Sequence, residues 1–232
     1  MRIRVSRPLA CLASALVLVT AALVAGGIRD AEAQVVPPAP VAWFAASAGS
    51  AKQVISVIGT GGSDAWLLAW EKRGTAWVAI GRGTAAKVGP QGISASYGET
   101  VSYTPAGVFT LPSSFGRQAN PGSGLPYRRI DTSDWWVSDS KSRFYNTYYR
   151  CTPGECPFRE SAGENLGRAG QPYDYAAVMG VNLARKPGAG SAYFLHASNG
   201  KPTAGCVSVP SANVVSLLKW LRPGALIAIK PR

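Results

Sequence analysis

The sequence predicts a mainly β fold, a sandwich or half-barrel of antiparallel or mixed strands with one or two helices. Short segments rich in β-branched and aromatic residues recur from residue 53 to residue 229. Many of the glycines between them, such as those at positions 81, 83, 89, 92 and 98, are spaced too closely for helices. Only residues 211–221 show the apolar spacing of a convincing amphipathic helix.

The first 33 residues have the layout of a secretory signal peptide. Three arginines within the first seven residues form a positive start, and an apolar run follows from Leu9 to Val24. Ala31 and Ala33 are small residues at the two positions that signal peptidase reads, which predicts cleavage before Gln34. Because the apolar run approaches the length that spans a bilayer, an uncleaved membrane anchor is the alternative. We expect an exported protein, in the periplasm, the cell wall or the extracellular space.

Residues 34–51 are predicted to be a Pro-rich linker, and residues 52–232 to form a single domain. The chain without residues 1–33 has 199 residues, which is enough for one domain with a substantial core. Its net charge is +10, because residues 1–33 hold four of the 24 basic and two of the 12 acidic residues. Outside the cytoplasm such a charge matches anionic cell-wall polymers better than nucleic acid, so we expect no nucleic-acid partner.

The predicted strands follow one another along this domain, and the segments between them indicate how they connect. Residues 66–70 and 75–80 are joined by Glu71-Lys72-Arg73-Gly74, which predicts a β-hairpin. Residues 112–170 show little periodicity, and a long irregular segment of this kind usually covers a site or forms part of one. The helix begins at Ser211, which can cap it, and ends before Pro223. The other predicted strands are residues 53–58, 108–111, 175–181, 192–195, 207–209 and 225–229.

The cysteines divide into a predicted pair and an odd thiol, since Cys11 lies in the predicted signal peptide. Cys151 and Cys156 flank a short loop with a Pro-Gly turn, which suits a local disulfide in an oxidising compartment. Cys206 is then unpaired, and an odd cysteine in an exported protein indicates an intermolecular bridge or a reactive thiol. The alternative is a zinc site made by Cys151, Cys156, His196 and Cys206, although the first pair is widely spaced for a zinc knuckle.

His196 is the only histidine in the chain and precedes Cys206 by ten positions. A turn-rich segment joins them, and closing a loop of this length costs little free energy, so the two side chains can meet. A neighbouring imidazole lowers the pKa of a thiol and takes its proton. Gly205 lets the backbone approach a substrate, and the amides of Gly205 and Cys206 could donate to an oxyanion. Taken singly, each residue is more often structural. Together they predict a nucleophile, Cys206, and its general base, His196.

The residues around this pair resemble the signature of the L,D-transpeptidase (YkuD-like) catalytic domain. That signature has a His at the end of a strand, a loop, and then Ser/Thr-x-Gly-Cys followed by apolar residues. The matching segments are Phe194-Leu195-His196 and Thr203-Ala204-Gly205-Cys206-Val207-Ser208-Val209. Upstream, Thr104-Pro105-Ala106-Gly107 is similar to the family's Thr-Pro-x-Gly segment. The resemblance extends from about residue 52 to residue 230.

The resemblance implies a β-sandwich of mixed sheets with one or two short helices, acting outside the cytoplasm on peptidoglycan stem peptides. Cys206 would attack the carbonyl after the third residue of a tetrapeptide donor and expel D-alanine, with His196 taking the thiol proton. The side-chain amine of a diaminopimelate-type acceptor would then resolve the thioester and form a cross-link. The resemblance also implies inhibition by carbapenems and no metal or organic cofactor, and we expect a monomer.

The cysteine loop departs from the family pattern at two places. Ser208 stands where many members have arginine, and Thr203-Ala204 where many have Ser-His or Ser-Arg. In the family these positions shape the cysteine loop and contact the donor carboxylates. The predicted oxyanion and substrate loop comprises Thr203, Ala204, Gly205 and Ser208. A basic residue from elsewhere could meet the substrate carboxylates instead, on charge alone: Lys201, Arg128 or Arg129.

Two other functions stay open. An L,D-carboxypeptidase would use the same nucleophile with water as the acceptor. A catalytically weak or inactive peptidoglycan-binding module would keep the fold without the chemistry. Its sugar-stacking candidates are Trp66, Trp70, Trp77, Trp135, Trp136 and Trp220. Papain-like enzymes place Cys before His and sortases place His much farther upstream, so the order and spacing here disfavour both.

Overall fold

The computed structural model describes residues 41–232. The predicted signal peptide, its cleavage site before Gln34 and the first part of the predicted linker lie outside the described residues. Among the helices of residues 41–232, none is long and apolar enough to cross a membrane.

The described residues form mostly strands, as the sequence predicts. The strands are β1 (Gln53–Gly61), β2 (Asp64–Arg73), β3 (Ala76–Lys87), β4 (Ile93–Ser94), β5 (Thr104–Pro105), β6 (Gly107–Thr110), β7 (Ser114–Gly116), β8 (Tyr127–Arg129), β9 (Asp134–Val137), β10 (Thr147–Arg150), β11 (Glu164–Asn165), β12 (Ala176–Val178), β13 (Phe194–Ala197), β14 (Val207–Val209) and β15 (Leu226–Lys230). The helices are α1 (Ser211–Trp220) and the 3₁₀-helices η1 (Ala45–Ser47), η2 (Glu160–Ala162), η3 (Leu166–Arg168) and η4 (Gln171–Asp174).

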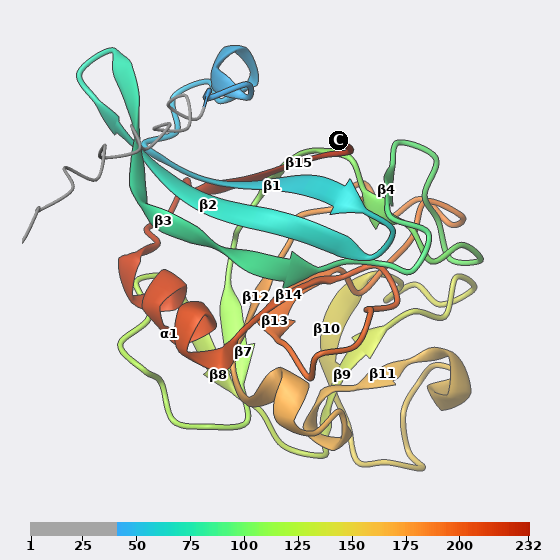
Figure 1. The fold of residues 1–232 in the computed structure, drawn as a ribbon. Helices are drawn as coiled ribbons and strands as arrows, with labels where there is room; N and C mark the ends of the chain where they lie inside the picture. Colours follow the sequence, from blue (N-terminus) through green and yellow to red (C-terminus); the bar gives the residue numbers. More distant parts are fainter. Residues whose placement is uncertain (1–40) are drawn as a thin grey trace, which may run out of the picture. The chain divides into compact units, whose positions relative to one another are not determined.

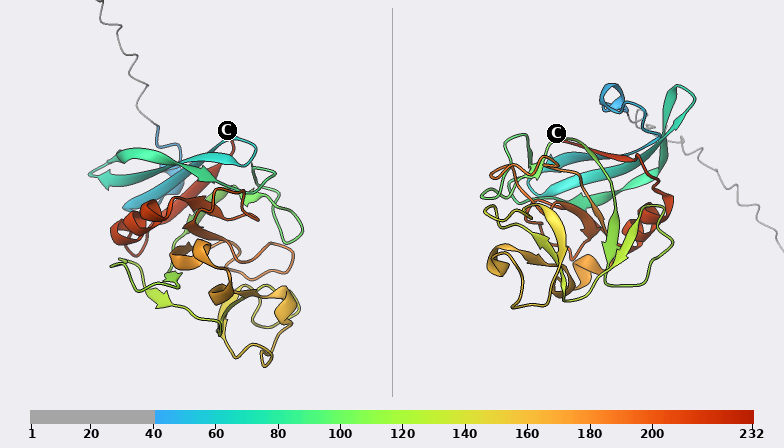
Figure 2. Two further views of the ribbon diagram at one scale, coloured as in Figure 1. Left: turned by 60° about the horizontal axis from the view of Figure 1, so that its bottom comes forward. Right: turned by 180° about the vertical axis from the view of Figure 1, so that it is seen from behind.

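Ten strands form one continuous sheet in the order β6-β15-β1-β2-β3-β14-β13-β12-β7-β8. The pairs β1–β15, β13–β14 and β7–β8 are parallel and the others antiparallel, so the sheet is mixed. Strands β3 and β14 pair only at Lys87 and Ser208. At this junction the sheet turns, so that the first half (β6, β15, β1, β2, β3) lies over the second half (β14, β13, β12, β7, β8), as Figures 1 and 2 show.

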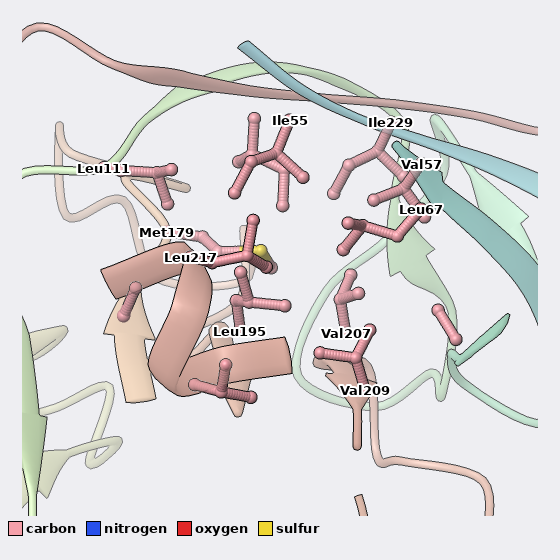
Figure 3. Close-up of a cluster of buried hydrophobic side chains, with 14 of the residues drawn as sticks. Ile55, Val57, Leu67, Leu111, Met179, Leu195, Val207, Val209, Leu217 and Ile229 are labelled. Carbon is pink, nitrogen blue, oxygen red and sulfur yellow. The ribbon is translucent and has the colours of Figure 1, made fainter. Parts of the chain in front are cut away.

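The main hydrophobic core lies between the two halves (Figure 3). Alternate residues of each strand point into it, because successive side chains of a strand lie on opposite faces. Burial of each large aliphatic side chain contributes about 1.5–3 kcal/mol. Helix α1 adds Leu217 and Leu218 to the same core. This arrangement confirms the predicted mainly β sandwich. The strand residues that meet in it include Ile55, Val57, Leu67, Leu195, Val207, Val209 and Ile229.

The outer face of the second half carries a separate apolar cluster that includes Cys206. Phe194 and Ala176 contribute from the sheet, and Leu166 and Tyr173 cover them from the segment that follows β8. Part of that segment forms a second, three-stranded sheet in the order β10-β9-β11. The predicted irregular region 112–170 therefore contains five short strands, which are too brief to show a sequence period.

The part of the predicted linker that is described packs on the outer face of the first half. Phe44 is 1% exposed and meets Trp70 and Trp77 edge to face, with ring centroids 5.5 and 5.2 Å apart. Ala48 belongs to the same apolar cluster. Because these side chains are buried against the sheet, residues 43–51 are packed as part of the domain.

Three local predictions differ from the structure. The strand predicted at 192–195 begins only at Phe194, because Ala192 has φ 57°, a left-handed conformation that a strand cannot contain. The strand predicted at 175–181 is limited to β12. Pro210 occupies the N-cap position of α1 and no side chain caps the helix, so Ser211 is its first helical residue.

Candidate active site

One cleft of about 580 Å³ gathers residues from distant parts of the chain. It is lined by six of the residues singled out in the sequence, together with residues from the loop before β5 and from the segment between β9 and β12. The six are His196, Lys201, Thr203, Ala204, Gly205 and Cys206. The irregular region predicted to form part of a site contributes Ser138, Glu164 and Ala169.

Strands β13 and β14 set the positions of the two predicted reacting side chains. They are parallel neighbours, with Leu195 opposite Val207 and His196 opposite Ser208. Leu195 and Val207 point into the main core, so the residues next to them point to the other face. His196 and Cys206 are therefore diagonal neighbours on the outer face of the sheet, and both line the cleft.

The thiol of Cys206 is buried and held by backbone groups. The Phe194 N–H donates to Sγ at 3.3 Å, and Sγ donates to the Ala192 carbonyl at 3.4 Å. The pKa of this thiol is raised to about 12, mainly by burial and also by the nearby carboxylate of Glu164, whereas the Phe194 N–H acts in the opposite direction. The thiol of Cys206 is therefore uncharged at rest.

The imidazole of His196 is oriented by a backbone contact. Its Nδ1 lies 2.9 Å from the Ala197 carbonyl oxygen, and because a carbonyl only accepts, Nδ1 carries the proton. This leaves a lone pair on Nε2 and makes that atom the proton acceptor. Tyr173 packs its ring against the imidazole at 5.5 Å. Burial lowers the pKa of His196, although the Ala197 carbonyl partly opposes this, so the ring is neutral at rest.

The structure brings the imidazole and the thiol into one cleft without a direct bond between them. Within residues 41–232, Nε2 of His196 makes no hydrogen bond, and Sγ of Cys206 bonds only to backbone groups. Catalytic hydrogen bonds often tighten only when substrate binds. The two side chains thus share the cleft without a hydrogen bond between them.

The loop before the nucleophile is tied together by hydroxyl groups. Thr203 Oγ1 donates to the Cys206 carbonyl at 2.6 Å and accepts from the Gly205 N–H at 3.2 Å. Thr104 Oγ1 donates to the same carbonyl at 3.2 Å. The Gly205 amide, predicted as an oxyanion donor, is thus already engaged by Thr203. In the described part of the chain the Cys206 amide has no acceptor and is the donor left for an oxyanion.

The remaining predicted loop and charge candidates lie in different places. Ser208 is 1% exposed and does not line the cleft, and its hydroxyl has no hydrogen-bond partner. Lys201 does line the cleft. Arg128 instead stacks on the ring of Tyr148, 4.2 Å from its centroid, beside a separate pocket. Arg129 does not line the cleft either, so of the three candidate basic residues only Lys201 does.

Several residues of the cleft carry no signal in the sequence. Glu164 and Tyr173 are joined by a hydrogen bond from the tyrosine hydroxyl to the carboxylate. Glu99 accepts a hydrogen bond from the hydroxyl of Tyr145. Glu164 lies in the two-residue strand β11, within the stretch that has no periodicity. The packing of that stretch over the outer face brings Glu164 into the cleft with Cys206.

The two predicted disulfide partners, Cys151 and Cys156, are joined in the structure with Cα atoms 5.4 Å apart. Two members of the alternative zinc set are thus bonded to each other. Among the described residues, Cys206 is a free cysteine. Of the tryptophans considered for sugar stacking, Trp66 is 45% exposed, whereas Trp70 and Trp135 are buried, and none of the six lines the cleft.

Comparison with known proteins assigns the family. No curated protein and no solved structure matches the chain significantly. The family model described as YkuD, L,D-transpeptidase catalytic domain, matches residues 64–229, a span that contains the cleft, His196 and Cys206. Because this match covers more than half of the sequence, the chain belongs to the L,D-transpeptidase (YkuD) catalytic domain family.

Proposed function

We propose that the protein is an exported L,D-transpeptidase that remodels peptidoglycan stem peptides through a thioester at Cys206. One observation carries this proposal. The free thiol of Cys206 and the imidazole of His196, the only histidine, open into one cleft from the same sheet face. The family supplies the reaction class, because L,D-transpeptidase-type enzymes act on peptidoglycan peptides.

In the acylation step, Sγ of Cys206 forms a bond to the carbonyl carbon after the third residue of a tetrapeptide donor. Because the thiol is neutral at rest, its proton passes to Nε2 of His196 as the bond forms. The Cys206 N–H donates to the developing oxyanion. The C–N bond then breaks, and the imidazolium gives its proton to the departing amine of D-alanine.

In the second step, a diaminopimelate-type side-chain amine attacks the thioester carbonyl. His196 takes a proton from the nitrogen, the C–S bond breaks, and the imidazolium protonates the sulfur. Water as the acceptor gives the L,D-carboxypeptidase reaction with the same residues. The amine acceptor is favoured because the cleft also contains the carboxylate of Glu164, which forms no ion pair within residues 41–232.

Two features support an exported protein. The disulfide between Cys151 and Cys156 is a bond that persists in oxidising compartments. The first 33 residues follow the pattern of a signal peptide. N-terminal sequencing of the protein recovered outside the cytoplasm is expected to begin at Gln34, and an intact Met1 there would contradict cleavage.

The nucleophile is tested by intact mass spectrometry after incubation with a carbapenem and by D-alanine release from a tetrapeptide muropeptide. The wild-type protein is expected to gain one carbapenem mass, and Cys206→Ala to gain none while it keeps the wild-type circular dichroism. His196→Gln is expected to acylate on the order of 10²-fold more slowly. An unmodified wild-type protein that binds peptidoglycan equally after thiol alkylation would contradict the enzyme and favour the binding module.

A further inference from the structure

Glu164 is a carboxylate in the active-site cleft that has no cationic partner. Its side chain lines the cleft with Cys206 and His196, and burial raises its pKa. Within residues 41–232 it forms no ion pair, and its one hydrogen bond is the one that Oε1 accepts from Tyr173. A desolvated carboxylate is costly unless it is paired, and such groups in clefts often mark binding sites.

This carboxylate lies beside both reacting groups. It is close enough to Cys206 to raise the pKa of the thiol electrostatically. Its hydrogen-bond partner Tyr173 packs against the ring of His196 with centroids 5.5 Å apart. A cation held by Glu164 would therefore be near the thioester carbon and near the proton acceptor.

Two other charged side chains line the cleft in the described part of the chain, those of Glu99 and Lys201. Glu99 also lines the cleft and, like Glu164, accepts one hydrogen bond from a tyrosine hydroxyl, that of Tyr145. Of the two carboxylates, Glu164 is the one that raises the pKa of Cys206. Lys201 is the one Lys or Arg that lines the cleft among the described residues, and it forms no ion pair with them. Lys201 suits a substrate carboxylate, whereas Glu164 suits a substrate ammonium group.

We propose that Glu164 binds the acceptor, receiving on its carboxylate the side-chain ammonium group of the incoming stem peptide. This inference rests on the proposed function, because it requires a thioester at Cys206 for the amine to attack. Water carries no charge and therefore forms no ion pair with this carboxylate. Glu164 is thus the residue that favours cross-linking over hydrolysis.

Forming an amide from an ammonium group requires the loss of two protons. The bound ammonium gives the first proton to the Glu164 carboxylate, which can accept it because burial raises its pKa. The amine nitrogen then bonds to the thioester carbonyl carbon, and Nε2 of His196 takes the second proton. The C–S bond breaks, the imidazolium protonates the sulfur, and Glu164 releases its proton to solvent.

The test compares the full-chain enzyme with Glu164→Gln, using a diaminopimelate-containing disaccharide tetrapeptide as both donor and acceptor. Liquid chromatography with mass spectrometry measures the acyl-enzyme, released D-alanine, hydrolysed tripeptide and cross-linked dimer. Glu164→Gln is expected to form the acyl-enzyme at least as fast as wild type, because the substitution removes a charge that raises the pKa of Cys206. Its dimer-to-tripeptide ratio is expected to fall at least about tenfold, the effect of losing one contact to a charged group. Tyr173→Phe, which keeps the ring beside His196, is expected to lower the ratio less.

Hydroxylamine separates acceptor binding from a structural role, because this nucleophile is uncharged at neutral pH. We expect Glu164→Gln to form the hydroxamate at the wild-type rate. A parallel loss of acylation, hydroxamate and dimer would contradict the inference and assign Glu164 a structural role. Glu99→Gln removes the same charge from another part of the cleft, and an equal fall in its dimer ratio would also contradict it. A wild-type enzyme that forms no acyl-enzyme would instead refute the proposed function itself.

Discussion

The environment of Cys206 keeps its thiol protonated until a substrate arrives. Burial raises its pKa to about 12, and the carboxylate of Glu164 acts in the same direction. The Ala192 carbonyl accepts a hydrogen bond from the thiol, which favours the protonated form as well. In the proposed mechanism the thiol must therefore lose its proton to His196 during attack, because no thiolate exists in advance.

This protonation state predicts how alkylation depends on pH. Iodoacetamide reacts with the thiolate, so its rate at Cys206 in the folded protein is expected to keep rising above pH 9.0 without levelling off. In the urea-unfolded chain the rate should level off once the pH passes the ordinary value of 9.0. Peptide mass spectrometry measures the alkylation rate in both states. Levelling below pH 9.0 in the folded state would contradict a buried neutral thiol.

The same difference in pKa makes the stability of the fold depend on pH. Because the pKa of Cys206 is higher in the folded state, the neutral thiol stabilises the fold below pH 9.0, and this contribution is lost toward about pH 12.

Gly205 has a backbone conformation and surroundings that exclude a side chain. Its φ is +143°, and an added Cβ would lie 2.9 Å from the Tyr193 ring and 3.0 Å from the Tyr103 carbonyl oxygen. Gly205→Ala is therefore expected to lower the free energy of unfolding by about 1–3 kcal/mol. It should also displace the Cys206 amide and slow acylation by a carbapenem.

Gly200 offers a matched control in the same loop. It also has a positive φ, +83°, but an added Cβ would meet no atom within 4 Å. Gly200→Ala should show a comparable backbone cost of about 1 kcal/mol with acylation unchanged. If both variants acylate at the wild-type rate, the close packing at Gly205 has no role in placing the nucleophile.

At the scale of elements, one buried amide connects the strands that frame the cleft. Oδ1 of Asn146 accepts from the Trp136 indole N–H at 2.9 Å and from the Ala192 N–H at 3.4 Å. Its Nδ2 donates to the carbonyls of Val181 and Asn182 at 3.1 and 2.9 Å. The segment before β13 is thus fixed to the three-stranded sheet, and the left-handed Ala192 that accepts from the thiol is held with it.

Asn146→Leu is expected to lower the free energy of unfolding by about 2–3 kcal/mol, because it leaves buried donors and acceptors unpaired. Acylation should also slow, since the carbonyl of Ala192 loses its support. Urea denaturation measures the first effect and the carbapenem mass shift the second. Asn120→Ala, in an exposed turn, should cost less than about 1 kcal/mol. Equal losses for both variants would contradict a linking role for Asn146.

The sequence predicts elements well where a strand is long enough to show its period. Strands β1, β2 and β3 span nine to twelve residues, and each was predicted at its place. Strands β9 and β11 span four and two residues, which is too short for alternation to be visible. The left-handed turn at Ala192 was also missed, because alanine gives no local signal for a positive φ.

The candidate site also contains some residues that a local sequence pattern predicts and others that it does not. Cys206 and His196 were predictable because they are close in sequence, rare in this composition and next to apolar strands. Glu164 and Tyr173 reach the cleft only because residues between β8 and β12 fold over the outer face of the second half. That contact depends on tertiary packing between distant segments, which no local pattern encodes. The roles of Cys206 and His196 stay predictions until the acylation experiments are done.

At the scale of the whole domain, the packed region begins before the predicted boundary at residue 52. Phe44 is buried among Trp70, Trp77 and their neighbours on the outer face of the first half. This face lies away from the main core, so the segment at residues 43–51 covers apolar surface that would otherwise contact water.

Phe44→Ala is expected to lower the free energy of unfolding by about 3 kcal/mol, the typical cost of removing a buried aromatic ring. Val41→Ala provides the control, because Val41 is 78% exposed and its truncation should change stability by less than about 0.5 kcal/mol. Thermal and urea unfolding measure both. A Phe44→Ala protein as stable as the wild type would show that the segment is only a linker, as the composition predicts.

The single pairing between Lys87 and Ser208 also bears on how the domain can move. If one half of the sheet rotates slightly against the other, the narrow ladder between β3 and β14 is the natural axis. In such a rotation each atom is displaced in proportion to its distance from the axis. Cys206 is only two residues from Ser208, so its thiol lies close to this axis and is displaced little. This rotation would then widen or narrow the part of the cleft farthest from β3 and β14, while the sulfur of Cys206 hardly moves.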